Sequence, residues 1–117
     1  MEYLIIALIL FFLFKRIIPP KGVKHISTTQ LKELLNDKNK QYIDVRTPGE
    51  YKGNHIKGFK NLPLNQITEK AEKELNKDKE VIVICQSGMR SQQASKRLKK
   101  LGFTNVTNVK GGMSAWS

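Results

Sequence analysis

A short run of β-branched residues, Val81–Ile84, leads directly into the only cysteine of the 117-residue chain, Cys85. A glycine-containing turn follows, and after it comes a segment with helical periodicity. This order predicts a strand, a loop and a helix. Four consecutive apolar residues indicate a strand buried on both faces, as at the centre of a parallel sheet. The chain is therefore expected to build an α/β fold around this strand.

The loop after Cys85 lies where a helix is expected to begin. The first amides of a helix have no partner inside it, and that end of its dipole is positive, so the junction can hold an anion. A thiol placed there is expected to ionise more readily than a free one, and the thiolate is the nucleophile. A lone cysteine ending an apolar strand can also be an inert buried residue. The residues of the loop, with Gly88 and Arg90 among them, favour a reactive thiol.

The rest of the chain repeats the alternation of strand and helix. Strands are predicted over 23–26, 42–45, 58–62, 81–84 and 106–109, helices over 27–35, 67–75 and 91–101, and a turn or short helix over 46–51. Strands that alternate with helices imply a mostly parallel sheet with helices on both faces. Ligands of such folds bind at the carboxyl ends of the strands, where Cys85 is expected to lie.

The composition limits the chemistry that the chain can perform. A length of 117 residues suits one domain and a short appendage. A single cysteine forms no internal disulfide, which fits a reducing compartment. It also leaves no second thiol to resolve a covalent intermediate, so an outside molecule must do so. His25 and His55 are far apart and show no ligand spacing, so neither a metal nor another cofactor is expected.

The formal net charge is +11, from 21 Lys and Arg against 10 Asp and Glu. Nucleic-acid binding usually adds aromatic stacking platforms or a recognisable module, and the sequence shows neither. We therefore expect no nucleic-acid partner. A solvated basic surface, an anionic membrane and small anionic substrates remain as explanations of the charge.

The amino-terminal segment is apolar without interruption from Tyr3 to Phe14. As a helix it would be about 18 Å long, shorter than the ~30 Å hydrocarbon core of a bilayer. The range 1–18 becomes a feasible anchor if Lys15 and Arg16 extend to the headgroups and the bilayer thins locally. A buried helix of a soluble fold is the alternative.

A cleaved signal peptide would carry its positive charge before the apolar run and small residues at the cleavage site. Here the cations follow the run, and they favour a cytoplasmic position for what comes after it. The sequence therefore predicts a membrane anchor over 1–18, a linker over 19–22 and one domain over 23–117. The expected location is the cell membrane, as a single-pass protein whose domain faces the cytoplasm.

Several motifs then resemble those of the rhodanese-like sulfurtransferase family over 23–117. They are DVRTPGEY at 44–51, GNHIKG at 53–58, NLP at 61–63, CQSGMRS at 85–91 and GGMSAW at 111–116. One such motif would be weak, but their order and spacing together are specific. The resemblance implies a rhodanese-like α/β domain with a central parallel sheet.

The resemblance also implies a reaction. The cysteine of the family takes a sulfane sulfur from a small anionic donor such as thiosulfate, or from a persulfide donor, and carries it as a persulfide. It then passes the sulfur to a thiol, to an acceptor protein or, in the test tube, to cyanide. By motif position, Cys85 is the nucleophile. The substrate-binding loop whose amides surround the sulfur is Gln86, Ser87, Gly88, Met89, Arg90 and Ser91, and the supporting residues are Asp44, Arg46 and Glu50.

Physical reasoning about these residues agrees with that chemistry. A persulfide and a sulfonate are anionic, and fixed amide dipoles stabilise them without reorganising. Gly88 has no Cβ, which lets the backbone fold tightly beneath the sulfur. Arg90 can offer its planar fork either to the sulfonate of thiosulfate or to a carboxylate.

Two other functions remain possible at this point. Phosphatases of the cell-cycle type share the fold, but their active-site loop has the pattern His-Cys-x5-Arg. Here only four residues separate Cys85 from Arg90, and Ile84 replaces the histidine. The other alternative is a membrane-tethered module that carries persulfide or docks a partner without catalysis. Regulatory domains of this fold usually lose the cysteine, which favours the enzyme.

Overall fold

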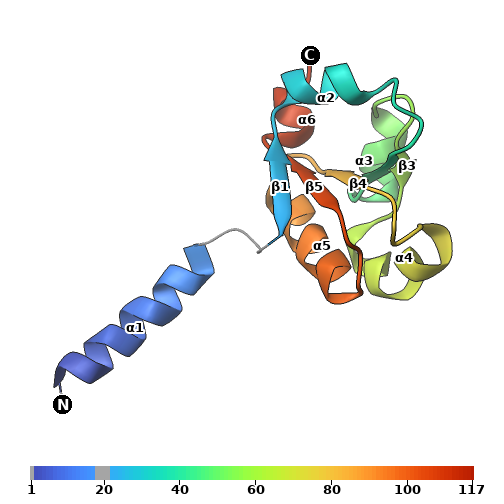
Figure 1. The fold of residues 1–117 in the computed structure, drawn as a ribbon. Helices are drawn as coiled ribbons and strands as arrows, with labels where there is room; N and C mark the ends of the chain where they lie inside the picture. The colour runs from blue at the N-terminus through green and yellow to red at the C-terminus, as the bar shows by residue number, and fades with distance from the viewer. Residues whose placement is uncertain (1, 18–21) are drawn as a thin grey trace.

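A five-stranded parallel sheet forms the centre of the fold in the computed structural model, which describes residues 2–17 and 22–117 and the side chains of all of these except 14–17 (Figure 1). The strand order across the sheet is β1-β5-β4-β2-β3. The strands are β1 (Val23–Ile26), β2 (Gln41–Asp44), β3 (Lys60–Asn61), β4 (Val81–Ile84) and β5 (Val106–Val109). The predicted parallel sheet is confirmed, and all five carboxyl ends lie along one edge.

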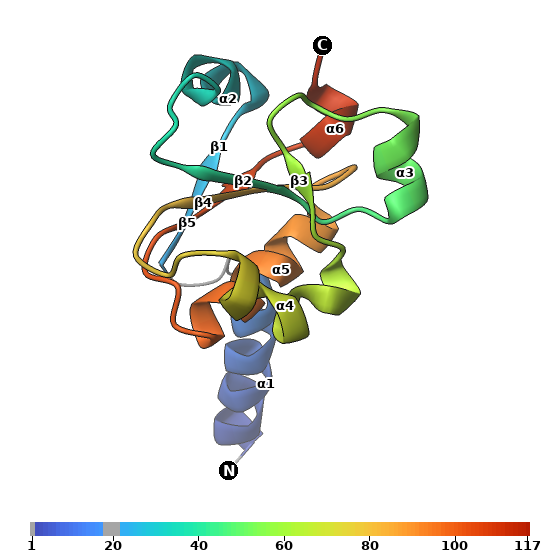
Figure 2. The same ribbon diagram turned by 90° about the vertical axis from the view of Figure 1, so that its right-hand side faces the viewer.

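Helices cover both faces of this sheet, as predicted. Figure 2 shows α4 and α5 on one side of the strands and α2 and α6 on the other. The helices of the domain are α2 (Thr28–Leu34), α3 (Pro48–Gly53), α4 (Ile67–Glu74), α5 (Met89–Lys100) and α6 (Gly112–Ala115), with a 3-10 turn, η1 (Leu64–Gln66), before α4. The sheet therefore has a hydrophobic core on each side.

Strand β4 belongs to both cores at once, because successive side chains of a strand point to opposite faces. Val81, Val83 and Cys85 pack in the core beneath α4 and α5. Ile82 and Ile84 pack in the core beneath α2 and α6. All four residues of β4 are fully buried, so the prediction of a central, doubly covered strand is confirmed.

The edge strand β3 is shorter than the sequence predicts. The predicted strand covered 58–62, but only Lys60 and Asn61 pair with β2. Gly58 has φ +98°, and the amide of Phe59 bonds back to the carbonyl of Ile56, so a turn occupies the residues before the strand. Pro63 follows and has no N–H to extend the ladder.

The amino-terminal residues Glu2–Ile17 form α1, and its large apolar side chains from Tyr3 to Leu13 are exposed. Within the described part of the chain, no helix combines the length and the hydropathy that crossing a membrane requires. The single-pass span predicted over 1–18 finds no support. The predicted linker, 19–22, lies outside the described residues apart from Gly22.

Candidate active site

Cys85 is the first residue after β4, at the carboxyl edge of the sheet, and its side chain is fully buried. Its Sγ accepts a hydrogen bond from the amide of Gly88 at 2.9 Å. The Ser91 hydroxyl lies 3.3 Å from Sγ and donates to the carbonyl of Gly88 at 3.0 Å. The sulfur therefore has two polar neighbours, both within six residues of it along the chain.

Gly88 makes this tight return possible. It is the N-cap of α5 and has φ +105°, a conformation that glycine adopts at little cost. In this position, directly before the first turn of α5, its amide points at Sγ. Sγ therefore lies at the positive end of α5.

The other members of the predicted loop take different positions. Among the described residues, Gly88 alone donates a backbone hydrogen bond to Sγ, and the placement of the other loop amides around a bound sulfur stays a prediction. Ser87 is exposed, and Met89 is 72% exposed at the tip of the loop. The side chain of Gln86 bonds to residues other than Cys85: it accepts from Arg46 Nη1 at 3.3 Å and donates to Ser114 Oγ at 3.2 Å.

Asp44 and Arg46 form a buried ion pair beneath the loop. The Arg46 Nε and Nη2 atoms donate to the Asp44 carboxylate over 2.8–3.1 Å, and both side chains are almost fully covered. Arg46 also donates to the Asn54 carbonyl, while the Asn61 amide donates to the carbonyls of Asp44 and Arg46. The pair thereby ties β2, β3, the end of α3 and the loop together. Nothing in the sequence indicated that Asn61 would join this network.

Glu50 and Arg90 form a second ion pair at the mouth of the site. Arg90 donates through Nη1 and Nη2 to the two carboxylate oxygens of Glu50, at 2.6 and 3.0 Å. Those bonds lower the pKa of Glu50 to about 2, and the carboxylate raises the pKa of Arg90. Arg90 thus contacts a carboxylate of this chain, and the expected contact with a sulfonate stays a prediction.

The amino end of α6 holds the loop from the opposite side. The amides of Met113 and Ser114 donate to the carbonyls of Cys85 and Gln86 at 2.8 and 2.9 Å. Gly112 packs so closely that a Cβ there would lie 2.2 Å from the Cys85 carbonyl oxygen. No site role was expected of these residues from the sequence. The paired glycines of the motif at 111–116 were the available signal.

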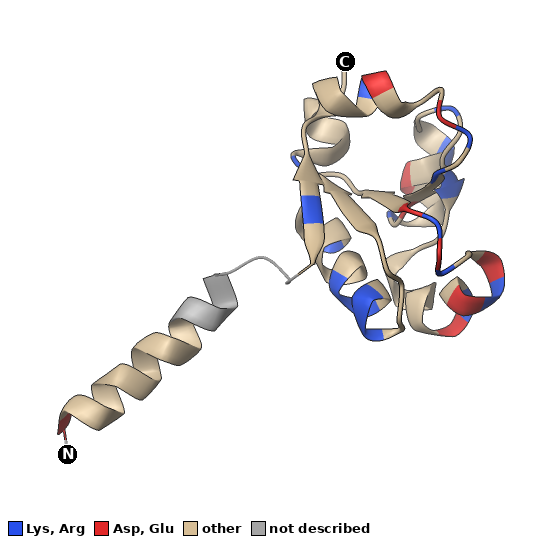
Figure 3. Cartoon of the chain, in the orientation of Figure 1, with Lys and Arg blue, Asp and Glu red and all other residues tan. Residues whose placement is uncertain are grey.

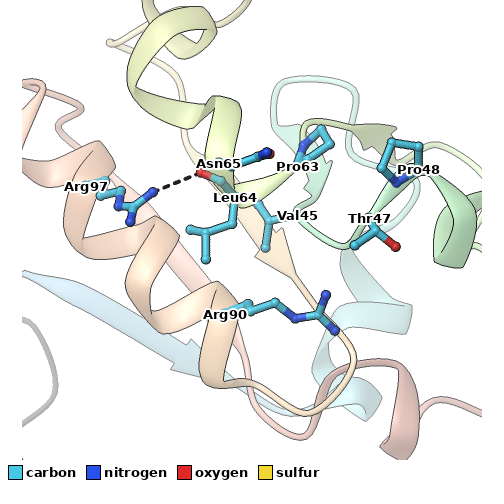
Figure 4. Close-up of a pocket in the computed structure, with 8 residues that line it drawn as sticks. All are labelled: Val45, Thr47, Pro48, Pro63, Leu64, Asn65, Arg90 and Arg97. Carbon is cyan, nitrogen blue, oxygen red and sulfur yellow. Dashed lines mark hydrogen bonds between the residues drawn. The ribbon is translucent and has the colours of Figure 1, made fainter.

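A cleft of about 300 Å³ adjoins the loop (Figure 4). Its apolar lining comes from Val45, Pro48, Pro63 and Leu64, and Arg90 and Arg97 lie along one side of it. No cluster of three or more His, Cys, Asp or Glu that could hold a metal occurs among the described residues. The site therefore combines one buried sulfur, two paired arginines and an apolar cleft.

A cysteine that closes the central strand of a parallel sheet, below a tight loop and a helix, is the arrangement expected of a rhodanese-like domain. The family model described as Rhodanese-like domain matches residues 27–117. The chain belongs to this family.

Curated proteins extend the similarity. The chain is 43% identical to YqhL of Bacillus subtilis over 65% of its own length and 60% of that protein. It is 44% identical to the putative sulfurtransferase YtwF of the same organism, over 80% of the chain and 90% of YtwF. It is 38% identical to the thiosulfate sulfurtransferase GlpE of Pseudoalteromonas translucida, over 80% of the chain and 88% of GlpE. The chain thus spans less than two thirds of YqhL and about nine tenths of the other two relatives.

A solved structure supports the same conclusion. The crystal structure of a rhodanese-like domain protein from Staphylococcus aureus superposes with a TM-score of 0.74 at 34% identity. The match covers 80% of this chain and 91% of that one.

Replacing Gly112 by Ala should destabilise the domain and disturb the loop, because the new methyl group would collide with the Cys85 carbonyl. We expect the free energy of unfolding to fall by about 1–3 kcal/mol, measured by urea denaturation. Gly49→Ala is the matched control, since a Cβ at Gly49 meets nothing within 4 Å. Equal stability of the two variants would contradict the proposed close approach of α6.

Replacing Glu50 by Gln should make stability less dependent on pH. The folded pKa of Glu50, about 2, lies below its ordinary value of 4.5, so its stabilising effect is full above pH 4.5 and disappears as the pH falls toward 2. The free energy of unfolding should be measured for both proteins between pH 7 and pH 3. The difference between wild type and variant should become smaller as the pH falls. A difference in the free energy of unfolding that does not change with pH would mean that the ion pair does not cause it.

Proposed function

We propose that this chain is a sulfurtransferase that accepts a sulfane sulfur on Cys85 as a persulfide and passes it to a thiol. The observation that carries the proposal is the 2.9 Å hydrogen bond from the Gly88 amide to Sγ, at the carboxyl edge of the sheet and the positive end of α5. The sulfurtransferases among the relatives support it.

The proposed reaction has two displacement steps, and Cys85 is the catalytic residue. First, the Cys85 thiolate attacks the outer sulfur of thiosulfate; the S–S bond of the donor breaks, sulfite leaves with the electron pair, and Cys85–S–S⁻ forms. Second, an acceptor thiolate attacks the outer sulfur of this persulfide and releases the Cys85 thiolate. Splitting the transfer through a covalent intermediate is nucleophilic catalysis.

The loop supports the charged species in both steps. The sulfur carries negative charge as thiolate and as persulfide, and the Gly88 amide is already aimed at that position. A donor fixed before the reaction stabilises charge without reorganising. The Ser91 hydroxyl, 3.3 Å from Sγ, can rotate to donate a second hydrogen bond.

The acceptor must come from outside the chain, because Cys85 is its only thiol. A small thiol and a cysteine of an acceptor protein both satisfy this requirement. We also propose that the domain works beside the cell membrane on its cytoplasmic side, held there by α1. Supporting this, the large apolar side chains from Tyr3 to Leu13 are exposed, with Tyr3 at 87%.

The proposal predicts that thiosulfate adds one sulfur to the protein, which intact-mass analysis detects and which reductant removes. Cys85→Ser should abolish both this addition and turnover with a cyanide or thiol acceptor. Ser91→Ala, which keeps the thiol, serves as the comparison and should load with sulfur more slowly. A wild-type protein that no sulfane donor loads would refute the proposal.

Loading without turnover would instead indicate a persulfide carrier. Release of phosphate from a phosphoester would indicate the phosphatase, which the four-residue spacing between Cys85 and Arg90 disfavours.

A further inference from the structure

The last two turns of α5 carry lysines on one side of the helix. Lys99 and Lys100 follow Lys96 by three and four residues, so the three occupy neighbouring positions on one face. No acidic residue occurs in α5, and none of the three lysines has a carboxylate within ion-pair distance among the residues that the structure describes. We call these three residues the α5 lysine cluster.

The α5 lysine cluster lies beside the place where the domain joins the amino-terminal helix. A Cβ at Gly22 would lie 3.1 Å from Cε and 3.3 Å from Nζ of Lys99, so Lys99 lies against the residue that precedes β1. Figure 3 shows the cations of α5 on the side of the domain where β1 begins, and the acidic residues of α4 farther from it.

The chain between α1 and the domain is too short to separate them widely. Four residues, 18–21, lie between Ile17 at the end of α1 and Gly22. Even fully extended, the chain from Ile17 to Gly22 reaches at most about 18 Å. The lysine cluster therefore always lies close to the end of α1.

Helix α1 supplies only part of what stable membrane binding requires. Its 16 residues give a length of about 24 Å, and its large apolar side chains from Tyr3 to Leu13 are exposed. A single apolar element binds a bilayer reversibly, and a polybasic patch can supply the second contact. Each Lys or Arg near an anionic surface strengthens binding by about fivefold. The sequence places Lys15, Arg16 and Lys21 just before the domain, and the cluster adds three more cations.

The topology fixes where the active site lies relative to the lysine cluster. The strands are parallel and β1 begins next to Gly22, so the cluster lies at the amino edge of the sheet and Cys85 at the carboxyl edge. Helix α5 connects the two, since it starts directly after Gly88 and ends at Lys100. Its 12 residues span about 18 Å. A bilayer that contacts the cluster therefore faces the side of the domain opposite the active-site loop.

We propose that the α5 lysine cluster binds the headgroups of anionic lipids, as a second contact beside α1, and holds the active-site loop facing away from the bilayer. This inference rests on the membrane location proposed above and adds a binding surface and an orientation to it. The acceptor that reaches Cys85 is then a molecule of the aqueous phase, because the mouth of the site is directed toward water.

The first test measures binding of the full-length protein to lipid vesicles by co-sedimentation. Vesicles of phosphatidylcholine alone are compared with vesicles of equal parts phosphatidylcholine and phosphatidylglycerol. Replacing Lys96, Lys99 and Lys100 together by Gln should weaken binding to the anionic vesicles by about tenfold or more, and should leave binding to phosphatidylcholine within about twofold of wild type. High ionic strength should remove the difference between the two proteins on anionic vesicles.

The matched control replaces three exposed lysines elsewhere, Lys52, Lys57 and Lys110, by Gln. They lie in α3, before β3 and after β5, and Figure 1 shows these elements away from the end of α5. The two variants have the same net charge, but charges farther from the bilayer than the ~8 Å Debye length are screened. The control should bind anionic vesicles within about threefold of wild type. Equal losses in the two variants would overturn the lysine cluster as the contact.

The second test locates the domain on the bilayer and keeps all the lysines. Because Cys85 is the only cysteine, Cys85→Ser allows one new thiol to be introduced and labelled with a fluorophore. Thr104→Cys places the label just after α5, and Met89→Cys places it at the active-site end of this helix; both residues are exposed.

A nitroxide on the lipid headgroup should quench the label at position 104 about threefold more than the label at position 89, because the length of α5, about 18 Å, separates the two positions. Equal quenching, or stronger quenching at position 89, would overturn the orientation.

The proposals fail in different ways. If the wild type binds both kinds of vesicle equally, the role of the lysine cluster fails and the membrane location stands. If it binds neither, the membrane location fails and the inference with it. Both results leave sulfur transfer by Cys85 standing, because intact-mass analysis after thiosulfate treatment tests that function separately.

Discussion

The two hydrogen bonds from the α6 amides to the carbonyls of Cys85 and Gln86 are the constraint on which the site depends. These bonds fix the two carbonyls toward α6, and the Gly88 amide of the same loop donates to the sulfur. The bonds require contact between backbones more than 25 residues apart, which is why residue 112 must lack a Cβ. A short carboxyl-terminal helix thereby determines the geometry of a loop that follows a different strand.

Buried charge holds the remaining sides of the loop. Asp44 and Arg46 lie at the end of β2 and form an ion pair in the interior of the domain. A buried ion pair is tolerated only when its hydrogen bonds are satisfied. Here the Asn54 carbonyl and the Gln86 side chain accept from the Arg46 guanidinium, and the backbone amide of Arg46 donates to Asp44 Oδ1. Glu50 and Arg90, each about one-third exposed, form the outer pair. The site is thus enclosed by compensated charges, and the Gly88 amide adds a fixed dipole at the sulfur.

The sequence was sufficient for the parts of the structure that depend on local patterns. The β-branched run, the turn glycine and the helical periodicity placed β4, Cys85 and α5 within two residues, because each signal lies within one stretch of chain. The ion pair between Arg90 and Glu50 could not be predicted from the sequence, since the two residues are 40 apart along the chain. Strand β3 was predicted too long because a turn at Gly58 competes with the ladder.

The complete burial of Cys85 affects how readily its thiol is oxidised. A thiolate that peroxide reaches is oxidised stepwise, and beyond the sulfenic stage the damage is generally permanent. Here the sulfur is buried with Gly88 and Ser91 against it, so oxidants have the same restricted approach to it as the sulfur donor and the acceptor. The exposed neighbour Met89 meets such molecules first, and its sulfoxide is repairable.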